Sequence, residues 1–146
     1  MAIKMSTGLR NQMLSGDSLK ALFDAGSEIR IYSGAVPSSA DNSIGAATLL
    51  CTIKNGASGI TFDTAAANGI LLKNPAEVWE GNNVATGTAT FYRHVLAADD
   101  DAVSATAPRY QGTVGIVGAD MNLTNTGLVI SAPQRIDYHA VTIATA

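Results

Sequence analysis

GTATFYRHVLA (residues 87–97) decides the fold, because its residues suit one long β-strand with side chains alternating between two faces. It predicts the longest strand of the chain, over residues 85–97. Similar short runs follow one another from residue 28 onward, each bounded by Gly, Asn, Ser or Pro. These runs are EIRIYSG (28–34), TLLCTIKNG (48–56), GTVGIVG (112–118) and RIDYHAVTIAT (135–145). Strands of this length and spacing predict an antiparallel sandwich or barrel.

The connections between these runs favour one arrangement of the strands. Residues 34–47 and 99–108 are long and polar, as expected of surface loops. About eight strands with two such crossovers predict an all-β, jelly-roll-like antiparallel sandwich rather than a meander. A chain of 146 residues is about one domain long. We therefore expect a single domain, residues 1–146, with a helical N-terminal segment over 1–26 and a β-sandwich over 27–146.

The last run changes phase. Ile136 and Tyr138 share one parity, whereas Val141 and Ile143 share the other. A slip of one residue exchanges the two faces of a strand. The pattern predicts a β-bulge near residues 139–140, or burial of both faces.

Residues 6–25 follow a helical period instead. Leu19, Leu22 and Phe23 have the i, i+3, i+4 spacing of an amphipathic helix. An interruption at residues 15–17 predicts one broken helix or two short ones, with Ser15 or Asp17 as a cap and an end near residue 26. This segment either covers an open end of the sandwich or forms an arm that reaches a neighbouring subunit.

Composition limits the partners of the chain. Charged residues make up 14% of it, against about 25% in typical globular domains. The net charge is −3 and no cluster of cations is present, so we expect no nucleic-acid binding. No signal peptide and no membrane span are recognisable, which predicts synthesis in the cytoplasm and no membrane partner. Low charge suits a subunit packed against others, and it is also found in ordinary small-residue β domains.

Few residues offer metal chemistry. His94 and His139 are the only histidines, and Asp137 lies two residues from His139 on the expected strand face. Isolated strand histidines are better explained as partly buried polar residues than as ligands. The run Asp99-Asp100-Asp101 is better explained as a solvated loop tip than as a calcium site. We expect no metal site.

Catalytic motifs are also missing. Glu77 and Glu80 flank Trp79, and paired carboxylates beside an aromatic ring can serve a sugar. A single tryptophan is weak evidence for a carbohydrate-binding groove, so we expect Trp79 in the core or in a subunit contact. Cys51 lies in a strand interior, where a free thiol acts as a small hydrophobe. The sequence predicts no catalytic residue, no cofactor and no enzymatic activity.

Several segments resemble small virion proteins of tailed bacteriophages. They are STGLRNQML (6–14), LKALFDAG (19–26), IRIYSG (29–34), VPSSAD (36–41), AEVWEGNNVATGTATFYR (76–93), APRYQGTVG (107–115) and DMNLTNTGLVI (120–130). Some proteins of this kind are head decoration, or cement, proteins with a jelly-roll-like fold. The resemblance transfers no catalytic residue.

The resemblance implies a structural virion protein made in the bacterial host cytoplasm and located on the capsid exterior. It would bind the outer surface of an HK97-type capsid, with the major capsid protein as partner, and cement neighbouring subunits as a homo-oligomer, with a dimer favoured. One alternative is a tail or head–tail connector protein. Another is a carbohydrate-binding β-sandwich, favoured if Glu77, Trp79 and Glu80 line one groove.

Overall fold

The computed structural model describes residues 3–143, in which a main sheet has the strand order β1-β8-β7-β2-β3, with β9 parallel to β8. Its strands are β1 (Lys4–Met5), β2 (Ser27–Ser33), β3 (Thr48–Ile53), β7 (Phe91–Leu96), β8 (Arg109–Gly115) and β9 (Met121–Asn122). Three antiparallel ladders accompany the sheet: β4 (Ile70–Leu72) with β12 (Ala140–Thr142), β5 (Trp79–Asn82) with β11 (Pro133–Ile136), and β6 (Gly87–Thr88) with β10 (Gly127–Leu128).

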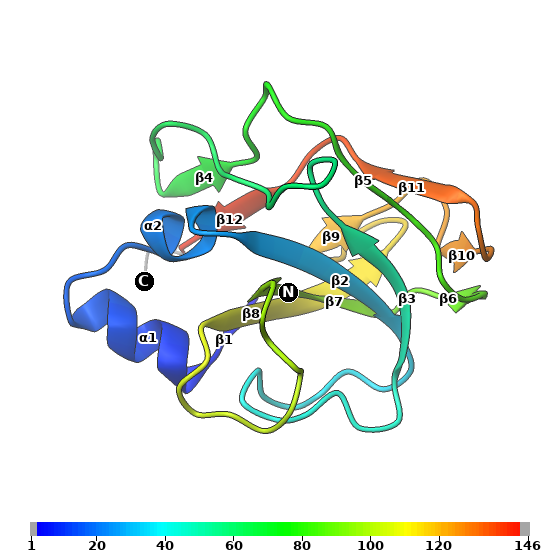
Figure 1. The fold of residues 1–146 in the computed structure, drawn as a ribbon, viewed down its shortest axis with the longest axis horizontal. Helices are drawn as coiled ribbons and strands as arrows, with labels where there is room; N and C mark the ends of the chain where they lie inside the picture. Colours follow the sequence, from blue (N-terminus) through cyan, green and yellow to red (C-terminus); the bar gives the residue numbers. More distant parts are fainter. Residues whose placement is uncertain (1–2, 144–146) are drawn as a thin grey trace.

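Figure 1 shows the ladders β4–β12 and β5–β11 along one side of the main sheet and the two long loops along the other. The predicted all-β antiparallel sandwich with a short helical segment is confirmed. The strands are shorter and more numerous than the eight expected, because several of them change partner after a few residues.

The hydrophobic core fills the space between the main sheet and the ladders. Ile29 and Ile31 of β2 face it and are fully buried, as their shared parity predicts. Trp79 from β5 and Phe62 from a neighbouring connection pack edge to face there, with ring centroids 6.2 Å apart. On β7 both faces are buried, because the long loops cover the face that points away from this core.

The N-terminal segment contains two short helices, as predicted: α1 (Thr7–Leu14) and α2 (Leu19–Asp24). Their N-caps are Ser6 and Ser18, whose hydroxyls accept hydrogen bonds from backbone N–H groups three residues later, so the prediction of Ser15 or Asp17 was wrong. Among residues 3–143 no helix is long and apolar enough to cross a membrane.

The helices cover the sandwich and do not form a free arm. Leu9 and Phe23 are fully buried in the core. Strand β1 pairs with β8, and a Cβ added to Gly8 would lie 2.3 Å from the backbone of Thr106. Only a glycine allows α1 to approach that loop so closely. The covering role is therefore confirmed, whereas contact of this segment with a neighbouring subunit stays a prediction.

Two predicted strands are divided. The strand expected over residues 85–97 becomes β6 and β7, because the N–H of Ala89 bonds to Thr126 while that of Thr90 bonds to Tyr32. The longest strands are β2 and β8 instead. The phase change in the last run marks the transition from β11 to β12, not a bulge near His139. The irregularity in pairing lies in β3, where Leu50 is the extra residue opposite Ile31 and Tyr32.

Candidate functional site

The largest polar cluster lies on the outer face of the main sheet. Arg30, Arg93 and Gln111 stand in register on β2, β7 and β8. Arg109 lies two residues before Gln111, so it shares that face. Arg93, Arg109 and Gln111 are almost completely buried. Buried cations are costly unless they are paired, so this face requires carboxylates from elsewhere in the chain.

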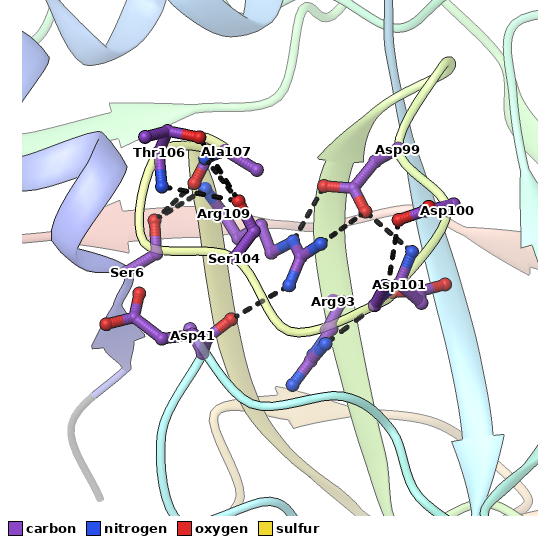
Figure 2. Close-up of polar contacts among 12 residues, drawn as sticks. Ser6, Asp41, Arg93, Asp99, Asp100, Asp101, Ser104, Thr106, Ala107 and Arg109 are labelled. Atoms are coloured by element: carbon purple, nitrogen blue, oxygen red, sulfur yellow. Dashed lines mark hydrogen bonds and ion pairs between the residues drawn. The ribbon is translucent and has the colours of Figure 1, made fainter.

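The loop over residues 97–108 supplies two of these carboxylates (Figure 2). Arg109 donates from Nε and Nη2 to the two carboxylate oxygens of Asp99, at 2.6 and 2.7 Å. Asp101 accepts a bond of 2.7 Å from Arg30 and lies 3.6 Å from Arg93. Glu28, on β2 itself, accepts from Arg30 at 2.7 Å. Three arginines thus face three carboxylates, and the buried charge is balanced.

The second long loop, residues 34–47, is held by the same side chains through its backbone. Arg93 donates to the carbonyl of Asn42 at 2.7 Å, and Gln111 donates to that of Pro37 at 2.7 Å. Asp41 accepts bonds from the backbone and hydroxyl of Thr7 at the start of α1. These bonds hold the pKa of the Asp41 carboxyl below its usual value. We call this set of contacts the ionic clamp.

Charge and burial act against each other within the ionic clamp. Burial lowers the pKa of Arg93, and nearby Asp101 offsets this only in part. Burial alone would lower the pKa of Arg30, but the hydrogen bonds that it donates to Asp101 and Glu28, together with the charges of these carboxylates, outweigh burial and raise the pKa above its usual value. Burial and the bond to Asp101 raise the pKa of Tyr32. The hydroxyl of Tyr32 therefore stays protonated and donates to Asp101.

The prediction that the run Asp99-Asp100-Asp101 is a solvated loop tip was wrong. Asp99 and Asp101 point inward to the arginines, and only Asp100 is exposed. Asp101 adopts a left-handed backbone conformation, φ 60°, which makes a tight turn here without a glycine. The missed signal was the presence of arginines at the centres of otherwise apolar strands, where a charge needs a partner.

A second polar cluster lies inside the core. The imidazole of His94 lies between the hydroxyls of Ser27, at 2.6 Å from Nε2, and Tyr110, at 2.5 Å from Nδ1. The Tyr110 hydroxyl is also 2.9 Å from Nε2 of His139. The Ser27 hydroxyl also donates to the carbonyl oxygen of Ile60, at 3.4 Å. With that bond made, His94 donates to Ser27, Tyr110 to His94, and His139 to Tyr110. All four residues are buried.

Burial keeps both imidazoles neutral. It lowers the pKa of His139 to about 4, and that of His94 well below its ordinary value. The structure brings the two histidines together but leaves Asp137 outside: this residue is exposed and pairs with Arg135. The prediction that Asp137 and His139 share a strand face was wrong, because both lie between β11 and β12. No group of three potential ligands that could hold a metal occurs among the described residues.

Trp79 is a core residue, as predicted. It is fully buried, and its indole N–H donates to Glu77 at 2.7 Å. Lys73 lies over the ring, 5.4 Å from its centroid. Glu80, the next residue on β5, is exposed, so the two glutamates and the tryptophan do not line one groove. Cys51 is also buried in a strand interior, as expected, and burial raises the pKa of its thiol to about 11.

Both polar clusters connect parts of this chain to one another. The ionic clamp joins two loops and α1 to the sheet, and the histidine chain joins β2, β7, β8 and the connection before β12. Comparison with models of protein families, with curated proteins and with solved structures finds no match. A function therefore has to be argued from the geometry of the chain and from the resemblance of its segments.

Proposed function

We propose that this chain is a structural virion protein that binds the outer surface of an HK97-type phage capsid and cements neighbouring major capsid proteins. It acts there as a homo-oligomer, with a dimer favoured over a trimer. The proposal starts from the resemblance of its segments to phage decoration proteins. Its location on the virion and its capsid partner are parts of the same proposal.

The observation that carries the proposal is the ionic clamp. The buried Arg93 and Arg109 and the half-buried Arg30 donate hydrogen bonds to the backbone of the loop over residues 34–47, to Asp99 and to Asp101. The two longest loops are thereby fixed to the sheet. A fixed loop loses little conformational entropy on binding, so more of its contact energy appears as affinity. A protein that braces a pressurised shell needs such a preformed contact surface.

The two alternative functions, a tail or connector protein and a carbohydrate-binding sandwich, require different structural features. A tail or connector protein needs the same rigidity, so only its position and copy number in the particle distinguish it. A carbohydrate-binding sandwich needs an accessible aromatic platform, and Trp79 is fully buried. The second alternative therefore lacks the residue that suggested it.

Electron cryomicroscopy of intact particles that carry this chain tests the proposal. Density for the fold in many copies over the outer shell is the expected result. Density confined to the tail or to a ring at the portal would overturn the proposal in favour of the first alternative. Density absent from the particle would overturn both.

A binding experiment tests the role of the ionic clamp separately. Purified chain is added to expanded heads that lack it, and bound copies are counted after sedimentation. Asp99→Asn removes the carboxylate charge opposite Arg109 and should reduce occupancy. Asp17→Asn makes the same change at an exposed residue outside both loops and should decorate fully. Equal occupancy by a folded Asp99→Asn variant would show that a fixed loop is not required.

A further inference from the structure

Two stretches of the chain that meet at one end of the molecule carry no charged side chain. The stretches Gly81–Tyr92 and Met121–Gln134 contain no Asp, Glu, Lys or Arg. The structure places them side by side: β6 pairs with β10, and β5 pairs with β11. Figure 1 shows β6 and β10 at the end of the molecule opposite α1 and α2. We call residues 81–90 and 121–134 the uncharged wing.

Backbone hydrogen bonds make the uncharged wing a fixed surface. The N–H of Asn83 donates to Ala132 at 2.9 Å, and Ser131 donates back to Asn83 at 2.8 Å. The side chain of Asn83 donates to the carbonyl of Val129 at 3.0 Å. Ile130 donates its N–H to the hydroxyl of Thr86 at 3.0 Å. The turn over residues 129–132 is thereby joined to the start of β6.

This fixed surface presents apolar side chains to solvent. Val84, Val129 and Ile130 are 57, 58 and 55% exposed. They lie on two segments that the bonds of Asn83 connect. Ser131 is held in a left-handed conformation, φ 68°, at the turn that displays two of them. Left-handed backbone is uncommon outside glycine and is retained where the surrounding structure imposes it.

We infer that the uncharged wing is the contact surface between two copies of this chain. In a two-fold contact the same patch meets itself, so a residue near the axis lies close to its own copy. A charge placed there would face a like charge across the axis. A chain of net charge −3 avoids this repulsion by associating through a surface without charges. The wing meets that requirement and supplies apolar area for burial.

This inference deepens the proposed function, because it assigns the surface of the dimer that decorates the shell. Sedimentation equilibrium of the full chain over the micromolar range tests it without any capsid. The wild type is expected to be a dimer. Ile130→Lys places two like charges at the contact and should raise the dissociation constant at least about tenfold. Val84→Lys should do the same if the first variant folds poorly.

Val103→Lys is the matched control, since Val103 is 73% exposed on the loop over residues 97–108. It makes the same change of charge outside the wing and should leave the dimer intact. A monomeric wild type, or equal weakening by a folded Ile130→Lys and by Val103→Lys, would overturn the inference. A monomeric wild type whose binding to heads is lost in Ile130→Lys would overturn it in favour of the shell as the partner of the wing. The proposed binding to the capsid would survive that result, whereas the proposed dimer would not.

Discussion

Lowering the pH from 7 to 5 should destabilise the protein through His139. Burial lowers the pKa of this imidazole to about 4, against about 6.5 in an unfolded chain. Between these values the unfolded chain binds a proton that the folded state does not bind, so stability falls as the pH falls. The 1.5 pH units between 6.5 and 5 correspond to a loss of about 2 kcal/mol. The loss continues down to about pH 4 and then levels off.

The environment of His139 explains why the proton is excluded. Its ring stacks on Tyr110, lies edge to face with Tyr92, and has Trp79 and His94 as further neighbours. None of these groups carries a negative charge at neutral pH, because burial raises the pKa of both tyrosines. An imidazolium here would have no counter-ion. His94 has its pKa lowered as well, so it adds to the loss in the same direction.

Urea unfolding at pH 7, 6 and 5, followed by the fluorescence of Trp79, measures the effect. A loss of about 2 kcal/mol also corresponds to a fall in melting temperature of about 4–8 °C for a chain of this size. His139→Gln keeps a donor toward Tyr110 but cannot titrate, so its stability should fall by about 2 kcal/mol less over this range. Parallel losses in both proteins would refute the reasoning. So would a nitrogen chemical shift showing a charged His139 in the folded protein at pH 5.

Three further predictions concern packing and the ionic clamp. Asp99→Asn leaves a buried guanidinium underpaired and should cost about 3–5 kcal/mol, whereas Asp100→Asn on the exposed side of the same loop should cost less than about 0.5 kcal/mol, both by chemical unfolding. Gly8→Ala should destabilise the protein by about 1–3 kcal/mol or more in the same assay, because the added methyl group would overlap with the backbone of the loop at Thr106; unchanged stability would show that α1 can move away. Trp79→Ala should cost about 3–5 kcal/mol through the cavity it leaves; a variant with unchanged melting would contradict its burial.

The sequence predicted those features that depend on neighbouring residues. Helix α2 follows from the spacing of Leu19, Leu22 and Phe23, and the interruption at residues 15–17 separates it from α1. The dipeptide Asn68-Gly69 is typical of a turn, and both residues have positive φ between mutually bonded Ala67 and Ile70. Burial of Trp79 also followed from its surroundings in sequence. In each case the decisive information lies within a few residues.

Other features depended on partners far away in sequence. Thr90 looks like the middle of a strand, yet a break precedes it because Ala89 finds its partner in Thr126. Asp99 and Asp101 look like solvated loop residues, yet their arginine partners lie on three different strands. The histidines gave no local sign of their shared bond to Tyr110. The alternation of apolar and polar residues along one segment does not predict such pairings, because strand pairing brings together residues far apart in the chain.

The strand order also governs when the fold can form. The central pair of the main sheet is β2 with β7, in which Ile29 lies opposite His94. The nearest residues of that pair, Tyr32 and Phe91, are nearly sixty residues apart in sequence, and β1 has to wait for β8, where Met5 lies opposite Tyr110. Contacts so distant in sequence impose their entropic cost before they contribute stability, and proteins built from them fold in milliseconds to seconds. Strand β2 can pair early with β3, which follows after a loop of fourteen residues, but a ribosome must release about two thirds of this chain before β7 covers the other edge of β2, and still more before β1 meets β8.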